Sequence, residues 1–296
     1  MLEFSKLELC NIEKLRPLIL QGSSRICNNT VGGVFIWRDF FSLEYALFND
    51  TVIFKASENH PGISTVFSIP LGKDVRGGIE KAADYCRFHK LPVAFYAVTD
   101  DDLEPLRSAF GKYELYTNEN WSDYIYHADD LVKLEGRKYS GKRNHVNQFK
   151  RFYDSYSFEE INNENLPQAQ EFYAELSSEL TYTTKTAIED HAKTTEVLEN
   201  YDTYGLLGGL LRVGDSVVAF SIGETKGDVL FIHIEKADMR YKGVYQVINN
   251  EFAKHFVSEE IKFINREEDD GDLGLRNSKQ SYHPFKVTPK HIFVVQ

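Results

Sequence analysis

Apolar and polar positions alternate along this chain in two rhythms, one typical of strands and one typical of helices. Ile79, Ala82, Ala83 and Cys86 stand at positions i, i+3, i+4 and i+7, which predicts an amphipathic helix over 75–89. Shorter apolar runs bounded by Asn, Asp, Gly or Pro predict strands. In the first half we predict strands at 4–9, 42–48, 52–56, 64–69, 92–98 and 113–126, turns at 49–50 and 60–62, and further helices from 11 and over 101–110.

The same order of elements returns after residue 130. The second half is predicted to hold a basic helix within 133–151, strand 156–161, helices 165–180 and 187–200, strands 206–213, 216–224 and 229–235, helix 244–257, strand 261–265, helix 272–282 and strand 291–295. Strands and helices that alternate in this way indicate an α/β (α+β) fold. A length of 296 residues favours two domains. We predict them at residues 1–130 and 131–296.

Composition narrows the classes of protein to which the chain can belong. Hydrophobic residues make up 42% and charged residues 27%, which is ordinary for globular proteins and excludes collagen, coiled-coil rods and wholesale disorder. Cys10, Cys27 and Cys86 have no C-x-x-C spacing, so we expect neither a disulfide framework nor a thiolate zinc site, and we expect a cytoplasmic protein. No run of 18 apolar residues occurs, so no transmembrane insertion is expected.

Several common catalytic and cofactor motifs are missing from the sequence. G-x-S-x-G, H-E-x-x-H, the Gly-rich dinucleotide fingerprint and the phosphate loop are all absent, which disfavours hydrolase, zinc protease, Rossmann and P-loop functions. The acidic run at 267–272 does not match a calcium loop, because Arg266 stands where an EF-hand needs an acid five residues before Gly271. We therefore expect no metal, and we expect these acids to cap the next helix.

Positive charge is concentrated in one segment. The net charge of the chain is −11, yet residues 133–151 hold seven basic residues and one acidic residue, a net charge of +6. On a helix, Tyr139, Val146 and Phe149 share an apolar face, and Lys142 falls within it. We expect Lys142 to point toward the protein body. It either lays its methylene groups on apolar surface or joins Arg143 in contacting an anionic donor, such as a coenzyme phosphate or an RNA backbone.

A second candidate feature is the segment Arg240-Tyr241-Lys242-Gly243, between an apolar strand and an apolar helix. A helix that begins there directs unpaired N–H groups and the positive end of its dipole outward, which suits a phosphate or an oxyanion. Glycine at position 243 would let a ligand approach the backbone, and Arg240 and Lys242 add positive charge. The alternative is an ordinary strand-to-helix turn with a solvated basic pair.

The residues of this segment and of three others resemble known families. The R-x-x-G-x pattern resembles the acyl-coenzyme A loop of the Gcn5-related N-acetyltransferase superfamily. The segments 136–149 (GRKYSGKRNHVNQF), 263–269 (FINREED) and 281–284 (SYHP) resemble the soluble family named after the phosphatidylglycerol lysyltransferase C-terminal domain. The resemblance implies two tandem acetyltransferase-like domains, each a mixed central sheet flanked by helices, with a degenerate copy at 1–130 and the active site at 131–296.

Tyr245 departs from the superfamily loop, which ordinarily ends in Gly or Ala at that position. The resemblance implies two possible donors. Acyl-coenzyme A is the donor of the acetyltransferases, whereas relatives that transfer aminoacyl groups from charged tRNA use the same fold without a complete coenzyme loop. The lipid acceptor of the membrane lysyltransferases is not carried over, because those relatives have transmembrane helices.

Polar residues near the predicted strand ends are candidates for the chemistry of acyl transfer, which needs a base, oxyanion donors and an acid. Glu235 is the candidate base, and a two-residue period places His233 on the same face of its strand. The resemblance implies that Tyr282 is the acid that protonates the leaving group. Alternatives are an edge carboxylate, a core histidine and a packing tyrosine. The candidate substrate-binding residues, which follow a predicted strand end, are His233, Asn265, Arg266, Glu267 and Glu268.

These features together predict a transferase. We expect it to move an acyl or aminoacyl group from a phosphate-bearing carrier, acyl-coenzyme A or aminoacyl-tRNA, to an amine or hydroxyl acceptor. Arg240, Lys242 and Gly243 would hold the carrier, and Lys142 and Arg143 would add contacts to its phosphates. The alternative is a noncatalytic nucleotide- or RNA-binding module derived from a transferase, whose affinity would fall steeply with salt.

Overall fold

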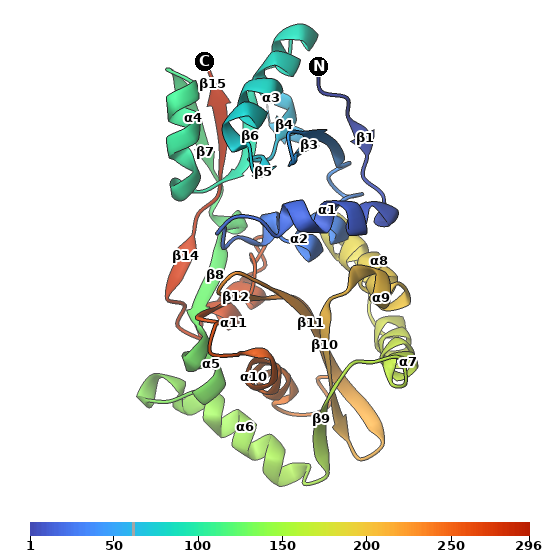
Figure 1. Ribbon diagram of the computed structural model, residues 1–296. Coiled ribbons are helices and arrows are strands. Elements are labelled where there is room, and N and C mark those ends of the chain that lie inside the picture. Colours follow the sequence, from blue (N-terminus) through green and yellow to red (C-terminus); the bar gives the residue numbers. More distant parts are fainter. Residues whose placement is uncertain (61–62) are drawn as a thin grey trace. The chain divides into compact units, whose positions relative to one another are not determined.

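The structure, a computed structural model, describes residues 1–60 and 63–296 and contains two mixed sheets (Figure 1). Part of the turn predicted at 60–62 lies outside the described residues. The chain folds into two compact units. The N-terminal unit comprises residues 1–123, 268–273 and 287–296, and the C-terminal unit comprises residues 124–267 and 274–286.

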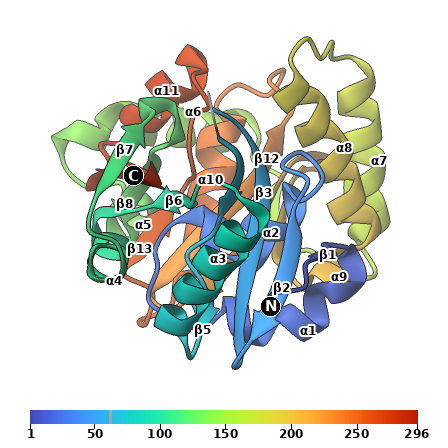
Figure 2. The same cartoon turned by 90° about the horizontal axis from the view of Figure 1, so that it is seen from above.

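The N-terminal unit is built on an eight-stranded sheet with the order β1-β2-β3-β4-β6-β15-β7, in which β5 pairs with β3. Its strands are β1 (Ser5–Lys6), β2 (Glu44–Phe48), β3 (Thr51–His60), β4 (Ile63–Phe67), β5 (Leu71–Gly72), β6 (Ala94–Val98), β7 (Tyr113–Thr117) and β15 (His291–Val295). Its helices are α1 (Ile12–Ile19), α2 (Val31–Ile36), α3 (Val75–His89) and α4 (Leu103–Ala109). The predicted stripe of α3 is buried in a core with Phe67, Phe95 and Phe293, and Figure 2 shows α3 lying along this sheet.

The last strand of the chain belongs to the N-terminal unit. β15 pairs antiparallel with both β6 and β7, so the chain returns to its first sheet after it has built the second. Domains at 1–130 and 131–296 stay a prediction, because contacts within the folded chain do not test which segments fold on their own.

A buried ion cluster joins the separate chain segments of the N-terminal unit. The Lys290 ammonium donates to Asp123 Oδ1 at 2.8 Å and to Asn28 Oδ1 at 2.8 Å, and it also pairs with Glu268. Cys27, Asp123 and Glu268 have ligand atoms within 4.8 Å of one another, an arrangement that suits a metal ion. Here the ammonium of Lys290 lies among them, 3.6 Å from Cys27 Sγ.

The C-terminal unit is built on a seven-stranded sheet with the order β14-β8-β13-β12-β11-β10-β9. The strands of this sheet are β8 (Asp123–His127), β9 (Tyr156–Glu160), β10 (Leu207–Val213), β11 (Ser216–Lys226), β12 (Val229–Ala237), β13 (Phe263–Asn265) and β14 (Lys286–Thr288). The boundary between the units falls after the first residue of β8 and after the first residue of β14. Its helices are α5 (Ala128–Lys133), α6 (Ser140–Phe152), α7 (Leu166–Ser178), α8 (Lys185–Glu199), α9 (Tyr201–Tyr204), α10 (Val244–Phe256) and α11 (Leu273–Gln280). Only β12 and β13 pair in parallel among the register pairs of this sheet that the structure describes.

Helices cover both faces of this sheet. α10 packs on β10, β11 and β12 and against α6, while α7 packs on β11 and lies beside α8 (Figures 1 and 2). Phe149 of α6 and Phe252 of α10 are fully buried in the core on the α10 side. Of the helices in the described part of the chain, none is long and apolar enough to cross a bilayer.

Two sequence predictions about strands are wrong. The single strand predicted at 113–126 is divided into β7 and β8, which belong to different sheets. Asn118 breaks it, because its side-chain oxygen accepts from the N–H of Asn120 and stabilises a tight turn over Glu119–Trp121. The prediction that His233 and Glu235 share one face of their strand is also wrong. Ile234 pairs with Ile222 but Ile232 pairs with Gly223, so the register has an irregularity at His233 that interrupts the two-residue alternation.

Candidate active site

The loop from β12 to α10 carries the predicted carrier-binding residues. Arg240 lies on Asp238, with its Nε at 2.9 and 2.8 Å from the two carboxylate oxygens, and its side chain is 74% exposed. Lys242 is exposed, and Tyr245, in the first turn of α10, is 36% exposed. The pairing with Asp238 neutralises the arginine, so this loop presents less positive charge than its sequence indicates.

Gly243 is required by helix packing. Its φ is +88°, and a Cβ built there would lie 2.9 Å from the main-chain oxygen of His145 in α6. Glycine therefore allows the start of α10 to contact the backbone of α6, and the neighbouring group at this position is a carbonyl oxygen, which repels a phosphate.

Replacing Gly243 with alanine is expected to destabilise the protein more than the same change at Gly214. Gly214 also has a positive φ, +58°, but a Cβ added there would meet no atom within 4 Å beyond its chain neighbours. We expect a loss of about 1–2 kcal/mol in the free energy of unfolding for Gly214→Ala, from the left-handed backbone alone, and a larger loss for Gly243→Ala. Chemical denaturation of both variants measures this. Equal losses would show that the contact with His145 is not constraining.

Three lysines of the basic segment pair with carboxylates of the C-terminal unit. Lys133 pairs with Asp129 at 2.8 Å, Lys138 with Asp130 at 3.0 Å and Lys150 with Glu251 at 3.0 Å. The Arg143 guanidinium donates to the main-chain oxygens of Leu134 and, at 2.7 Å, Gly136. Arg143 therefore caps the end of α5. Arg137 and Arg151 remain exposed on the surface.

Lys142 points into the C-terminal unit, as its position on the apolar face predicted. Its ammonium donates to Ser281 Oγ at 2.6 Å and lies 4.0 Å from the centroid of the Tyr282 ring. Burial, together with the positive charge of Arg266, lowers the pKa of Lys142 to about 8. The predicted orientation of Lys142 is confirmed.

Tyr282 is buried, with 3% of its surface exposed. Its ring contacts two cations, the Lys142 ammonium and the Arg266 guanidinium, whose Cζ lies 4.9 Å from the ring centroid. Burial raises the pKa of the Tyr282 hydroxyl well above its ordinary value, although Arg266 acts in the opposite direction. The main-chain oxygen of Tyr282 accepts from the Tyr139 hydroxyl at 2.9 Å, which fixes the residue against α6.

Glu235 is the centre of a polar cluster that we call the Glu235 cluster, comprising Glu235, Arg266, Asn249 and Ser221. Its carboxylate accepts from Asn249 Nδ2 at 3.1 Å and from Arg266 Nη2 at 3.3 Å, and Ser221 stands opposite it on β11. Three buried atoms of these neighbours have no hydrogen-bond partner among the described residues: Ser221 Oγ, Asn249 Oδ1 and Arg266 Nη1. Buried polar groups are nearly always paired, so the cluster is complete only with water or a ligand.

His233 forms a separate cluster with two carboxylates. Its Nδ1 lies 2.6 Å from Glu267 Oε1 and its Nε2 lies 2.8 Å from Glu224 Oε1. Burial alone would lower the pKa of His233, but the two carboxylates outweigh it and raise that pKa to about 10. The imidazole is therefore a buried cation at neutral pH and holds β11, β12 and the loop after β13 together.

The stability that His233 contributes is expected to depend on pH. Because its pKa is raised from 6.5 to about 10 on folding, its contribution is complete below pH 6.5 and disappears as pH rises through about 10. The difference in the free energy of unfolding between the native protein and His233→Gln should shrink over this range. Denaturation series at several pH values measure it, and a difference that stays constant would contradict a charged His233.

The four residues predicted from 265 to 268 have different partners. Asn265 Oδ1 accepts from the N–H of Glu267 at 2.7 Å and shapes the loop. Arg266 joins Glu235, Glu267 joins His233, and Glu268 joins Lys290 in the N-terminal unit. Of these four residues, Arg266 has a hydrogen bond to the candidate base Glu235.

The sequence analysis did not identify three residues near the candidate site: Ser221, Asn249 and Ser281. Ser221 had a usable signal, because it interrupts the apolar strand segment VVAFSI at 217–222. A polar residue inside a buried strand needs a partner. Asn249 and Ser281 had no comparable signal, since their roles depend on residues distant in the sequence.

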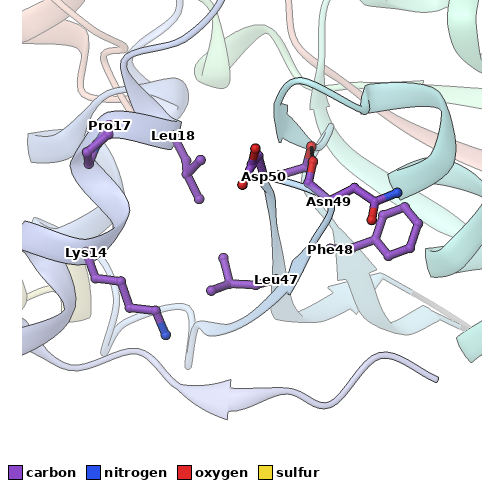
Figure 3. A pocket seen from close by; sticks show the side chains of 8 residues that line it. Lys14, Pro17, Leu18, Leu47, Phe48, Asn49 and Asp50 are labelled. Carbon is purple, nitrogen blue, oxygen red and sulfur yellow. Dashed lines mark hydrogen bonds between the residues drawn. The ribbon is translucent and has the colours of Figure 1, made fainter.

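A separate hollow of about 350 Å³ lies between α1 and the turn from β2 to β3. Figure 3 shows Leu18 and Leu47 pointing toward this space, and Phe48 pointing away from it. Its charged residues are Lys14 and Asp50, and Asp50 pairs with the exposed Lys73 at 3.0 Å. No convergent set of buried polar groups is found among its lining residues, so the Glu235 cluster is the stronger candidate for chemistry.

The family model described as phosphatidylglycerol lysyltransferase, C-terminal, matches residues 21–293. The chain belongs to this family. The match covers both units and includes the Glu235 cluster, Lys142 and Tyr282. The predicted family is confirmed.

Two solved structures have the same fold, and one further protein is similar in sequence. A conserved protein of unknown function from Bacteroides thetaiotaomicron is 26% identical, with all of both chains covered and a TM-score of 0.88. The C-terminal domain of a putative lysylphosphatidylglycerol synthetase from Agrobacterium fabrum is 13% identical, covers 98% of this chain and 93% of that one, and has a TM-score of 0.70. An uncharacterized protein from Mycoplasmoides gallisepticum is 24% identical over 211 residues. The aligned region covers 67% of this chain and 63% of that relative. The predicted α/β class, with mixed sheets flanked by helices, is confirmed.

Proposed function

We propose that this protein is an aminoacyltransferase that moves an aminoacyl group from tRNA to an amine or hydroxyl acceptor. The observation that carries the proposal is the Glu235 cluster, in which the neighbours of one carboxylate carry three buried polar atoms without partners among the described residues. Family membership supports the reaction type, since the family is described as a lysyltransferase.

Glu235 is the base in this proposal. Its carboxylate takes the proton from the acceptor N–H or O–H as the acceptor atom attacks the carbonyl carbon of the aminoacyl ester. Arg266 Nη1, which is buried and has no partner among the residues that the structure describes, is suited to donate a hydrogen bond to the developing oxyanion. The ester C–O bond then breaks, and the ribose oxygen of the tRNA leaves with a proton.

The surroundings of the β12–α10 loop favour a tRNA donor over acyl-coenzyme A. Asp238 holds Arg240, the His145 carbonyl oxygen adjoins Gly243, and Tyr245 occupies the first turn of α10. A pyrophosphate would meet a carboxylate and a carbonyl there. The exposed cations Lys242, Arg137 and Arg151 are suited to a phosphate backbone, whose contacts are spread over a larger surface.

A transfer assay tests this proposal. Radiolabelled lysyl-tRNA, other aminoacyl-tRNAs and acetyl-coenzyme A serve as donors, with glycinamide as the amine acceptor and phosphatidylglycerol vesicles as the hydroxyl acceptor. We expect acceptor-dependent transfer from at least one aminoacyl-tRNA and none from acetyl-coenzyme A. Transfer from acetyl-coenzyme A and from no aminoacyl-tRNA would contradict the proposed tRNA donor. Salt-sensitive tRNA binding without any transfer would show that the protein is a binding module instead.

A further inference from the structure

The ammonium of Lys142 lies beside the Glu235 cluster but has no carboxylate partner among the described residues. Its hydrogen-bond partner is the neutral hydroxyl of Ser281, at 2.6 Å, and its ring partner is Tyr282. Other lysines of the basic segment, such as Lys138 and Lys150, are held by carboxylates. The Lys142 ammonium is therefore a proton donor that forms no ion pair with a carboxylate among the described residues.

Resting on the proposed aminoacyl transfer, we propose that Lys142 is the general acid of the reaction, donating a proton from Nζ to the departing ribose oxygen. In this step the ester C–O bond breaks, its electron pair stays on the ribose oxygen, and one Nζ–H proton moves to that oxygen. Lys142 becomes a neutral amine. The proton that Glu235 removed from the acceptor is returned to Lys142 through solvent, so that protons balance over one cycle.

Tyr282 is less suited to this role than Lys142. A general acid works best when its pKa lies near the operating pH. Burial raises the pKa of the Tyr282 hydroxyl far above neutral, whereas burial and Arg266 lower the pKa of Lys142 to about 8. Tyr282 instead acts as a positioning residue, since its ring contacts both Lys142 and Arg266.

The charged and titratable groups around Lys142 are consistent with a lowered pKa. Arg266 faces it from the loop after β13 and Tyr282 from the segment after α11. On its own helix and the turn before it stand Lys138, Arg143 and His145. Glu235 of β12 is engaged by Arg266 and Asn249, so it does not hold the proton on Lys142.

Two substitutions separate proton donation from simple charge. Lys142→Arg keeps a positive charge, but a guanidinium does not release a proton at working pH, and Lys142→Met removes both properties. With aminoacyl-tRNA as donor, we expect both variants to lose about 10²–10⁴-fold in kcat. With a 4-nitrophenyl aminoacyl ester, whose leaving group needs no proton, we expect both to stay close to the native rate. Lys150→Met, on the same helix, is the control for folding.

The pH profile provides a second readout. Because the protonated amine is the active form, the native rate with aminoacyl-tRNA should fall as pH rises through about 8, and this limb should be missing with the 4-nitrophenyl ester. NMR of the lysine side chains should show Lys142 titrating near that pH without any substrate. Full activity of Lys142→Arg with aminoacyl-tRNA, or equal losses with both donors, would overturn the role of Lys142 alone. Absence of transfer by the native protein from every donor would overturn the proposed function and this role together.

Discussion

Glu235→Gln is expected to reduce aminoacyl transfer by about 10²–10⁴-fold, because glutamine cannot accept the proton of the acceptor. The glutamine amide has one oxygen in place of two, so it can still accept from Arg266 or from Asn249 but not from both, and the fold should persist. Arg266 would lose its anion, and we expect a fall of about 1–3 kcal/mol in the free energy of unfolding. Single-turnover rates with aminoacyl-tRNA, tRNA affinity and chemical denaturation measure the three effects separately.

Glu251→Gln is the matched control for Glu235. Glu251, on α10, is also a poorly exposed carboxylate, and it pairs with Lys150 and Lys254. It is not part of the Glu235 cluster. Its replacement should leave transfer unchanged and tRNA affinity intact. Equal transfer rates for Glu235→Gln and Glu251→Gln would show that Glu235 is not the base.

Lys290→Met is expected to produce the largest loss of stability. Its removal takes the Lys290 ammonium from the fully buried Asp123 carboxylate and from the Glu268 carboxylate, whose side chain is 31% exposed. Breaking such a buried pair costs about 3–5 kcal/mol. Burial alone would lower the pKa of Lys290, but Asp123, Cys27 and Glu268 raise it well above its ordinary value, which favours the charged ammonium.

The control for Lys290 is Lys73→Met, which breaks an ion pair of 3.0 Å with Asp50 whose side chains are each 69% exposed. Exposed pairs contribute about 0–1 kcal/mol, so this variant should be nearly as stable as the native protein. Both variants should be denatured in the presence of EDTA. Without the Lys290 ammonium, Cys27, Asp123 and Glu268 could otherwise bind a divalent cation. Similar stability for both variants would contradict a structural role of the buried cluster.

The fold was predictable from the sequence where local pattern and tertiary structure agree. The helix predicted at 75–89 is α3, with the same bounds, because its apolar stripe matches the face that packs on the sheet. The strand-to-helix order from β10 to α10 was predictable for the same reason. The division of 113–126 between two sheets was not, because both parts have strand character and only the turn at Asn118 separates them.

The candidate site was predictable in its residues but not in their grouping. Lys142 could be oriented from helix phase alone, and Glu235 and Arg266 were both identified as candidates. Their contact was not foreseeable, since it joins β12 to a loop about thirty residues later. The irregularity at His233 separates it from Glu235, and a one-residue change of register leaves no mark in the sequence pattern. The charge of the basic segment was overestimated because Asp129, Asp130 and Glu251 lie outside it.

The central claim is that the Glu235 cluster receives the reacting carbonyl group of an aminoacyl-tRNA. A crystal structure with 3′-lysylamino-adenosine, a stable amide analogue of the charged tRNA end, tests it most directly. We predict that the amide oxygen of the analogue lies about 3 Å from Arg266 Nη1, with its carbonyl carbon beside the Glu235 carboxylate. Analogue bound elsewhere on the protein, with Ser221, Asn249 and Arg266 satisfied by water alone, would contradict this account.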